Sequence, residues 1–505
     1  MEQTLQKVEE EFLEYVKKMA AYNEALSLIF WDMRTGAPKK GIEQRSEVVG
    51  MISQEVFQMS TSEEMANFIT ILEKGEGLSE KLQKTVGECK KEYERNTKIP
   101  KEEYKEYVIL QTKAESVWEE AKEQADFEMF RPYLEKLVEF NKKFIEYWGP
   151  AQEGGNKYDI LLDMYEPGVT VAILDETFAK LRDQIVPLVR KISESNNKPK
   201  TDFLFESFPR EKQKAFSLEV LRHMGYDFEA GRLDETVHPF AITLNPGDVR
   251  VTTKYDEQDF RTAVFGTIHE GGHALYEQNI SKDLIGTPLC DGTSMGIHES
   301  QSLFWENYMA RDYNFWVYFY DILKTNSNGQ FDDVELEVFY NAVNESKPSL
   351  IRIEADELTY PLHVMVRYEI EKGLFNDEIK VEDLPSIWNK KMEEYLGVTP
   401  KHDGEGVLQD VHWAGGSFGY FPSYALGYIY AAQFRATMLK DLPSLGELLR
   451  NGNLAPIKEW LTKNIHQYGK LKKPLEIVKD VTGEGLNPNY LIQYLEEKYS
   501  RIYGL

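Results

Sequence analysis

Cysteine is nearly absent from this sequence, which has only Cys89 and Cys290 among its 505 residues. Two thiols cannot form the disulfide framework of a small secreted protein, and their scarcity is typical of a reducing compartment. A chain of this length also needs no such cross-links, because it can bury a large hydrophobic core. Cys290 is therefore interpreted as a buried, inert thiol.

The sequence also lacks a surplus of basic residues and any long apolar run. Its formal net charge is −26, which disfavours nucleic acid as a partner because phosphate binding needs a basic surface. No segment has the roughly 18 consecutive apolar residues of a membrane span. The first residues, MEQTLQKVEEEFLEYVKKM, lack the basic and apolar regions of a signal peptide. We expect a cytoplasmic protein that binds neither nucleic acid nor membranes.

Most of the chain has apolar residues at helical spacing, without internal repeats. Ser60 followed by Glu63 predicts a capping box at one helix start. No composition break marks a boundary, so residues 1–505 are expected to form a single domain, arranged as one helical body or as two lobes around a groove. The pattern predicts a mainly α-helical fold, with helices over 2–25, 100–148, 171–193, 211–224, 351–372, 423–439 and 456–468.

Residues 238–255, HPFAITLNPGDVRVTTKY, depart from this helical pattern. Two extended runs flank the segment 245–248, whose Asn-Pro-Gly-Asp sequence is a strong turn signal. In the second run Val249 and Val251 point one way and Arg250 points the other. The region predicts a β-hairpin just before the helix considered next.

Residues 260–279 read FRTAVFGTIHEGGHALYEQN. On a helix, His269 and His273 lie on one face, where two neutral imidazoles can bind one zinc ion. Glu270 beside them can act as general base toward the metal-bound water. Chance produces such an HExxH pattern in roughly one or two chains per hundred. The internal pair Gly271–Gly272 supports function, because each glycine costs about 1 kcal/mol in mid-helix and indicates close approach of another backbone or of substrate.

A catalytic zinc also needs a third protein ligand and an open position. The segment GIHESQ at 296–301 begins a second amphipathic helix, and Glu299, 26 residues after His273, is the preferred ligand. His298 is the rival candidate. Neighbouring residues on a helix point in different directions, so only one of the two can face the metal. Glu306 is a weaker candidate, interpreted as a solvated residue.

Five further segments add to this pattern: HPF at 238–240, DVRVT at 248–252, HESQ at 298–301, IRIEAD at 351–356 and GVLQDVHW at 406–413. Together they give the chain a specific resemblance to the carboxypeptidase Taq family of thermostable metallocarboxypeptidases. They match the family's HPF, DxRxT, HES/GQ, (I/V)RxxAD and GxxQDxHW motifs in the expected order, and no motif position departs from the pattern.

The resemblance implies a mostly α-helical fold with a long groove and a short sheet beside the metal helix. It implies a homodimer that uses zinc, or cobalt in its place. The implied activity is release of C-terminal amino acids from peptides with a free C-terminus, with broad specificity and poor release at proline.

An exopeptidase of this kind must bind the free C-terminal carboxylate, and arginine does so through a bidentate fork. Arg352 and Arg250 are the candidates. The alternative for each is an ordinary salt bridge, such as Arg352 with Asp356 at i,i+4. The hairpin that carries Arg250 could also bind the peptide backbone by strand addition. His238 is expected either to bind substrate or to order the hairpin.

The developing oxyanion needs a donor besides zinc. The motif's last histidine, His412, offers an imidazole, and the following segment AGGSFGYFPSYALGY offers the phenols of Tyr420 and Tyr424. Tyr424 is the first choice, and the glycines suggest a mobile loop that closes over substrate. Asp410 and His298 are candidate partners that orient ligands by hydrogen bonds.

Two other functions stay open on the sequence alone. An oligopeptidase that cuts internal bonds of short peptides would use the same zinc chemistry without a carboxylate anchor. A helical binding protein with a structural zinc would need no general base, so an intact Glu270 argues against it.

Overall fold

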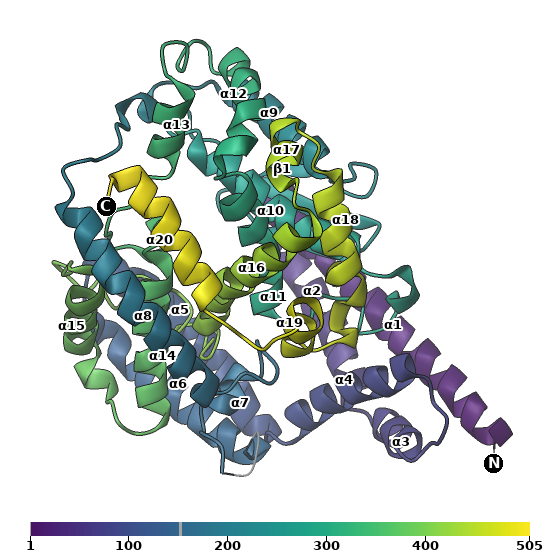
Figure 1. Cartoon of the computed structure of the whole chain (residues 1–505). Coiled ribbons are helices and arrows are strands. Elements are labelled where there is room, and N and C mark those ends of the chain that lie inside the picture. Colours follow the sequence, from purple (N-terminus) through teal and green to yellow (C-terminus); the bar gives the residue numbers. More distant parts are fainter. Residues whose placement is uncertain (1, 151–153) are drawn as a thin grey trace.

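The computed structural model describes residues 2–150 and 154–505, and helices dominate it, as predicted (Figure 1). The first half contains α1 (Glu2–Thr35), α2 (Ile42–Ser60), α3 (Glu63–Leu72), α4 (Glu80–Thr97), α5 (Lys101–Gln124), α6 (Phe127–Trp148), α7 (Asp159–Leu162), α8 (Val171–Glu194), α9 (Arg210–Met224), β1 (Leu233–Glu235), β2 (Ala241–Asn245) and β3 (Asp248–Thr253). The second half contains α10 (Arg261–Gln278), α11 (Met295–Leu303), the π-helix η4 (Phe304–Met309), α12 (Tyr313–Asn326), α13 (Leu336–Val343), α14 (Tyr360–Phe375), α15 (Leu384–Leu396), α16 (Phe421–Asp441), α17 (Leu445–Arg450), α18 (Ala455–Asn464), α19 (Pro474–Thr482) and α20 (Asn489–Tyr503).

Helix boundaries differ from the predicted ones where local backbone chemistry intervenes. The stretch 100–148 is two helices, because Ala125 adopts a left-handed conformation and the Asp126 side chain caps α6. Helix α14 begins only at Tyr360, with Pro361 in its first turn. The predicted cap of α3 was wrong by two residues: Ser62, rather than Ser60, accepts the hydrogen bond from the Met65 amide.

The predicted β-hairpin is confirmed and belongs to a three-stranded sheet of order β1-β3-β2. Strands β2 and β3 are antiparallel, and β1 pairs in parallel with β3, with Leu233 opposite Val251. Val249 and Val251 are fully buried, and α10 packs against β3. On the α1 side, Trp31 packs edge-on against Phe240, with ring centroids 5.6 Å apart. The sheet therefore lies between α1 and the predicted metal helix.

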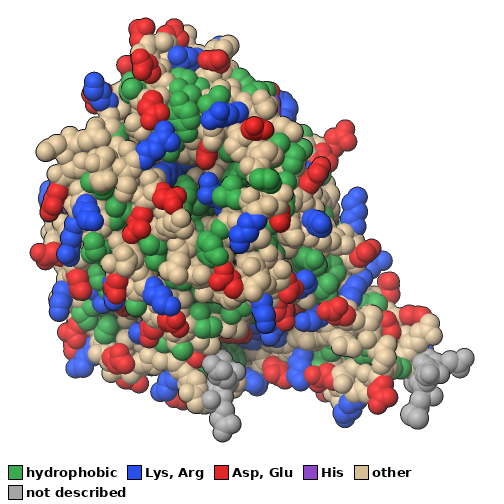
Figure 2. Space-filling model, in the orientation of Figure 1, with side chains coloured by type: hydrophobic (Ala, Val, Ile, Leu, Met, Phe, Trp, Pro, Cys, Tyr) green, Lys and Arg blue, Asp and Glu red, His purple; other side chains and the backbone are tan. Residues whose placement is uncertain are grey.

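Most of the buried apolar side chains belong to two clusters. The larger one runs from Ile99 to Tyr503 and includes α10, α11 and α16. The smaller one lies among α1–α4, which extend from the body near the N-terminus in Figure 1. Acidic and basic side chains are interspersed over the face shown in Figure 2. No described helix combines the length and apolarity needed to cross a bilayer. The expectation of a single domain stays a prediction.

Candidate active site

Helix α10 presents His269 and His273 to helix α11, and Glu299 on α11 lies between them. The Nε2 atoms of His269 and His273 are 3.8 Å and 3.5 Å from Glu299 Oε2. One ligand atom from each residue lies within 4.8 Å of the others. Ligand atoms of a tetrahedral zinc site lie roughly 3.4 Å apart, and two imidazoles with one carboxylate are a catalytic donor set. The residues present therefore fit a metal ion.

Two glycines allow α11 to approach both of its neighbours closely. A Cβ atom on Gly272 of α10 would lie 2.6 Å from the Gln301 carbonyl oxygen of α11. A Cβ atom on Gly427 of α16 would lie 2.7 Å from Cγ of Glu299. Any side chain at either position would displace α11. The expectation of close backbone approach is confirmed at Gly272, whereas Gly271 makes room for the Leu221 side chain.

Glu306 was expected to be solvated, and this was wrong. Its side chain follows α11 in the π-helix η4, and its Oε2 atom lies 2.9 Å from His269 Nδ1. Arg311 donates to the other carboxylate oxygen at 3.3 Å. Burial opposes a charged imidazole, but the carboxylates of Glu299 and Glu306 outweigh it and raise the pKa of His269 to about 10. The two carboxylates around His269 thus favour a positive charge at this position.

His273 is oriented through a second histidine. Its Nδ1 atom lies 2.6 Å from His298 Nδ1, and His298 Nε2 lies 2.9 Å from Glu277 Oε1. With His273 Nε2 directed at a metal, its Nδ1–H donates to His298, which donates in turn to Glu277. His298 therefore supports a ligand rather than competing with Glu299. The sequence reasoning missed Glu277, although its place four residues after His273 was a usable signal.

The protonation states of His273 and Glu270 suit a ligand role and a base role, respectively. Burial lowers the pKa of His273 to about 4, so its imidazole is neutral near pH 7. Burial also raises the pKa of Glu270 to about 7, helped by the negative charge of Glu299 and opposed by His269. A carboxylate with a pKa near the working pH is suited to taking up and releasing a proton.

Known proteins share this arrangement of sequence and fold. A model of the carboxypeptidase Taq (M32) metallopeptidase family matches residues 11–499. The chain belongs to this family. It is therefore a metallocarboxypeptidase, a hydrolase that acts on peptides and uses a metal ion.

Its similarity to characterised relatives extends over nearly the whole chain. It is 59% identical to carboxypeptidase 1 of Bacillus subtilis, with 98% of this chain and 99% of the relative covered. It is 41% identical to thermostable carboxypeptidase 1 of Thermus thermophilus, with 97% and 98% covered. The crystal structure of an M32 carboxypeptidase from Deinococcus radiodurans superimposes with a TM-score of 0.95 at 34% identity, covering 99% of this chain and 100% of that one.

The remaining candidate residues of this carboxypeptidase begin at the N-terminus of α16. Tyr420, Tyr424 and Gly427 follow one another at helical spacing and share a face. Because Gly427 contacts Glu299, that face is directed at the ligand group. Burial, followed by the charge of Glu299, raises the pKa of Tyr420, and burial raises that of Tyr424. Both phenols therefore keep their protons and can donate hydrogen bonds.

His412 lies beside these tyrosines. Its Nε2 atom is 3.4 Å from the Tyr424 hydroxyl, and its ring centroid is 5.4 Å from that of Tyr420. Burial lowers the pKa of His412 to about 4; Asp410 opposes this shift and the positive charge of Arg352 adds to it. The imidazole is neutral near pH 7.

The glycines after His412 suggested a mobile loop, which stays a prediction, and two of them also have conformational and packing roles. Gly416 and Gly419 adopt left-handed φ values of 70° and 88°. A Cβ atom on Gly419 would lie 2.6 Å from the Leu161 backbone, and one on Gly416 would collide with the Tyr107 hydroxyl. At these two positions glycine therefore allows the loop to pack closely against Leu161 and Tyr107.

Arg352 pairs with Asp410, and the alternative pair with Asp356 does not form. Its Nε and Nη2 atoms donate to Asp410 Oδ1 at 3.0 Å and 2.9 Å. Arg367 donates to Oδ2 of the same carboxylate at 2.6 Å. Asp410 thus orients two arginines rather than a metal ligand. Two cations sharing one anion leave a net positive charge, and the Arg352 guanidinium lies 5.0 Å from the Tyr424 ring centroid.

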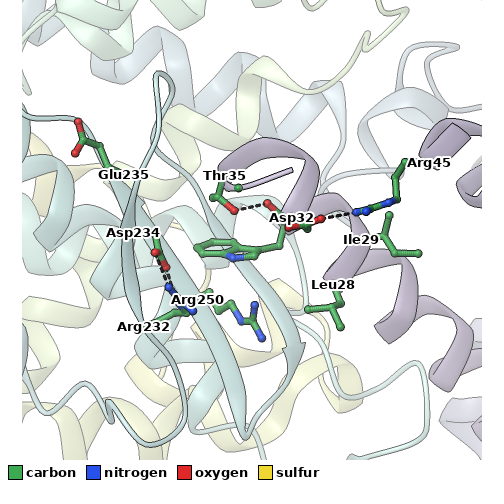
Figure 3. A pocket seen from close by; sticks show the side chains of 11 residues that line it. Leu28, Ile29, Asp32, Thr35, Arg45, Arg232, Asp234, Glu235 and Arg250 are labelled. Carbon is green, nitrogen blue, oxygen red and sulfur yellow. Dashed lines mark hydrogen bonds and ion pairs between the residues drawn. The ribbon is translucent and has the colours of Figure 1, made fainter. Parts of the chain in front are cut away.

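The other two substrate-binding candidates belong to the hairpin region, with Arg250 on β3 and His238 in the segment before β2. Asp248 holds Arg250 by two hydrogen bonds of 2.7 Å and 2.6 Å. Arg250 lines a cavity of about 570 Å³ between α1 and the sheet, together with Trp31 (Figure 3). His238 is exposed, and its backbone bonds to the Thr236 hydroxyl. Among the described residues, no hydrogen bond or ion pair links either side chain to the ligand group.

Proposed function

We propose that this metallocarboxypeptidase binds zinc through His269, His273 and Glu299 and releases single amino acids from free peptide C-termini. The observation that carries the proposal is that these three ligand atoms lie close together beside Glu270, a half-buried carboxylate whose pKa is raised to about 7. A structural metal site needs no such base. Cobalt has similar ligand preferences and is the proposed substitute.

When bound, zinc polarises the scissile carbonyl and lowers the pKa of water to about 7. In the proposed mechanism Glu270 takes a proton from the attacking water and passes it to the leaving amine. Tyr424 donates a hydrogen bond to the developing oxyanion, with Tyr420 as the second candidate and His412 as a neutral donor beside them. The raised pKa values of the tyrosines and the lowered pKa of His412 support these roles.

We propose Arg352 as the anchor for the substrate's terminal carboxylate. Its cluster with Arg367 and Asp410 has an excess positive charge next to Tyr424, which supports carboxylate binding. Arg250 is the weaker candidate, because the charge of Asp248 balances it and it lines the cavity between α1 and the sheet rather than lying beside Tyr424. A role for His238 in substrate binding would require a peptide that reaches the exposed turn before β2.

Broad specificity, poor release at proline, a homodimer and a cytoplasmic location complete the proposal. These four properties rest on the family resemblance and on the composition of the chain.

The proposal is tested with one peptide in two forms, carrying a free or an amidated C-terminus, with and without chelator. Products are followed by mass. Stepwise loss from the free C-terminus is expected, and amidation or chelation should abolish it. Adding zinc or cobalt to the chelated protein should restore it. Full activity on the amidated peptide would instead identify an oligopeptidase, and undiminished activity after complete metal removal would refute the metal mechanism.

The anchor is tested by comparing Arg352→Gln with Arg250→Gln at equal zinc content. Arg352→Gln should raise KM for the free peptide by more than tenfold, since it removes a charge-assisted bond. Arg250→Gln should have a smaller effect. The reverse order would assign the anchor to Arg250.

A further inference from the structure

Glu371 is a fully buried carboxylate on α14 that accepts three hydrogen bonds. Oε1 accepts from the Trp413 indole N–H at 2.7 Å. Oε2 accepts from the Gly419 backbone N–H at 2.7 Å and from the Tyr158 hydroxyl. No metal-ligand candidate is among these partners.

Two of these donors are the two ends of one loop, residues 413–419. Trp413 directly follows His412, and Gly419 directly precedes Tyr420. One side chain therefore holds both ends of the loop that joins the two residues. The middle of the loop is also held, since Gln111 on α5 donates to the Gly415 carbonyl at 2.7 Å.

The surroundings of Glu371 restrict which side chain can occupy this position. Three donors converge on two oxygens, so the position requires a group that only accepts, which an ionised carboxylate is and an amide is not. No salt bridge to Glu371 is formed among the described residues, and burial raises its pKa to about 7. A buried carboxylate without an ion-pair partner is unfavourable for folding. The presence of such a carboxylate indicates that the loop conformation held by Glu371 contributes to function.

We propose that Glu371 is a positioning residue for the peptidase reaction. By fixing loop 413–419 it keeps the His412 ring against Tyr424 and keeps Tyr420 on the face directed at Glu299. This inference rests on the proposed oxyanion roles of His412 and the tyrosines. Glu371 itself contacts neither substrate nor metal.

The test is Glu371→Gln, compared with Glu357→Gln at equal zinc content. Glu357 is also buried and accepts hydrogen bonds from Tyr499 and Lys498, away from the loop. A small displacement of catalytic groups lowers rates by about 100-fold. For Glu371→Gln we expect kcat to fall by about 10- to 100-fold, KM to change less than threefold, and zinc affinity to stay unchanged. Glu357→Gln should lose thermal stability but keep its kcat.

A second variant, Trp413→Phe, removes one donor and leaves Glu371 in place. It should lower kcat in the same direction by a smaller factor, which keeps the proposal testable if Glu371→Gln folds poorly. Wild-type kcat in a zinc-loaded Glu371→Gln protein, or in Trp413→Phe when Glu371→Gln does not fold, would overturn the inference.

A double-mutant cycle separates this inference from the proposed function. If Glu371 acts through the loop, its substitution should have little further effect in His412→Ala or Tyr424→Phe backgrounds. Multiplicative losses would overturn the positioning role. If His412→Ala and Tyr424→Phe themselves keep wild-type kcat, the oxyanion assignment fails, and the positioning role fails with it.

Discussion

Neighbouring carboxylates of this site differ in charge because their surroundings differ. Burial raises the pKa of Glu270 to about 7. Burial acts on Glu299 and Glu306 as well, but the charge of His269 and hydrogen bonds from the histidines overcome it and lower their pKa values. One residue type thus supplies a carboxylate that can take up a proton near pH 7 and two that stay ionised, all near His269.

At the residue scale, Glu270→Gln distinguishes zinc binding from proton transfer in the peptidase reaction. The amide preserves size but cannot take up a proton, so kcat should fall by about 10²- to 10⁴-fold. Zinc content, measured by metal analysis, should equal that of the wild type because the ligands are untouched. A variant with full zinc and the native rate would contradict the base role.

Glu166 gives a residue-scale prediction for pH. It accepts hydrogen bonds from Ser294, the Gly296 amide and Tyr430, and burial raises its pKa from 4.5 to about 7. Between these values the folded protein holds a proton that the unfolded chain has lost. Stability from this group is therefore greatest below pH 4.5 and falls by up to about 3 kcal/mol as the pH rises to 7.

Glu166→Gln removes that titration. Urea unfolding at pH 5 and pH 8 should show a smaller loss of stability over this interval than the wild type shows, even though the amide weakens the network at both pH values. Equal pH dependence in the two proteins would contradict the assignment.

At the scale of elements, the contact between α10 and α11 depends on Gly272. Gly272→Ala places a methyl group 2.6 Å from the Gln301 carbonyl and should push Glu299 away from the histidines. We expect a loss of about 1–3 kcal/mol from overpacking and weaker zinc binding in a chelator competition.

Gly266→Ala on the same helix is the matched control. Nothing lies within 4 Å of its added Cβ atom, so better helix propensity should stabilise it by about 1 kcal/mol. If both variants unfold at the same temperature and bind zinc equally, the contact does not hold the site together.

The sequence could predict those elements that a short stretch of residues specifies by itself. The periodic helices, the hairpin around its Asn-Pro-Gly-Asp turn and the HExxH helix are all elements of this kind. Strand β1 was missed because three residues show no alternation. The break at Ala125 was missed because neither glycine nor proline marks it.

The missed partners in the site depend on the tertiary fold. Glu306 pairs with His269 only because α10 lies over η4, and Asp410 meets arginines that are 58 and 43 residues away. Helical spacing carries no information on such contacts. Glu277 is the exception, since it lies one turn from His273 on the same helix.

At the scale of the whole molecule, a cavity made by mutation in one apolar cluster should destabilise that cluster and leave the other unchanged. Phe12 is fully buried in the α1–α4 cluster and Phe216 in the larger cluster with α10. Phe12→Ala should destabilise its cluster by about 3–5 kcal/mol and leave zinc affinity unchanged. Hydrogen exchange should show the loosening confined to α1–α4.

Phe216→Ala should instead lower protection around α9 and α10 and weaken zinc binding. A Phe12→Ala protein with zinc affinity as low as that of Phe216→Ala would show that the clusters are energetically one unit.

The position of α11 between α10 and α16 has a consequence for protein synthesis. The three ligand candidates have left the ribosome soon after residue 299 is made, but the face with Gly427, Tyr424 and Tyr420 follows more than a hundred residues later. At about 5–20 residues per second, this delay lasts several seconds or more. A nascent chain therefore carries all three ligand candidates for some seconds before it carries the helix face that packs against α11, so hydrolysis can begin only after residues 420–427 have been made.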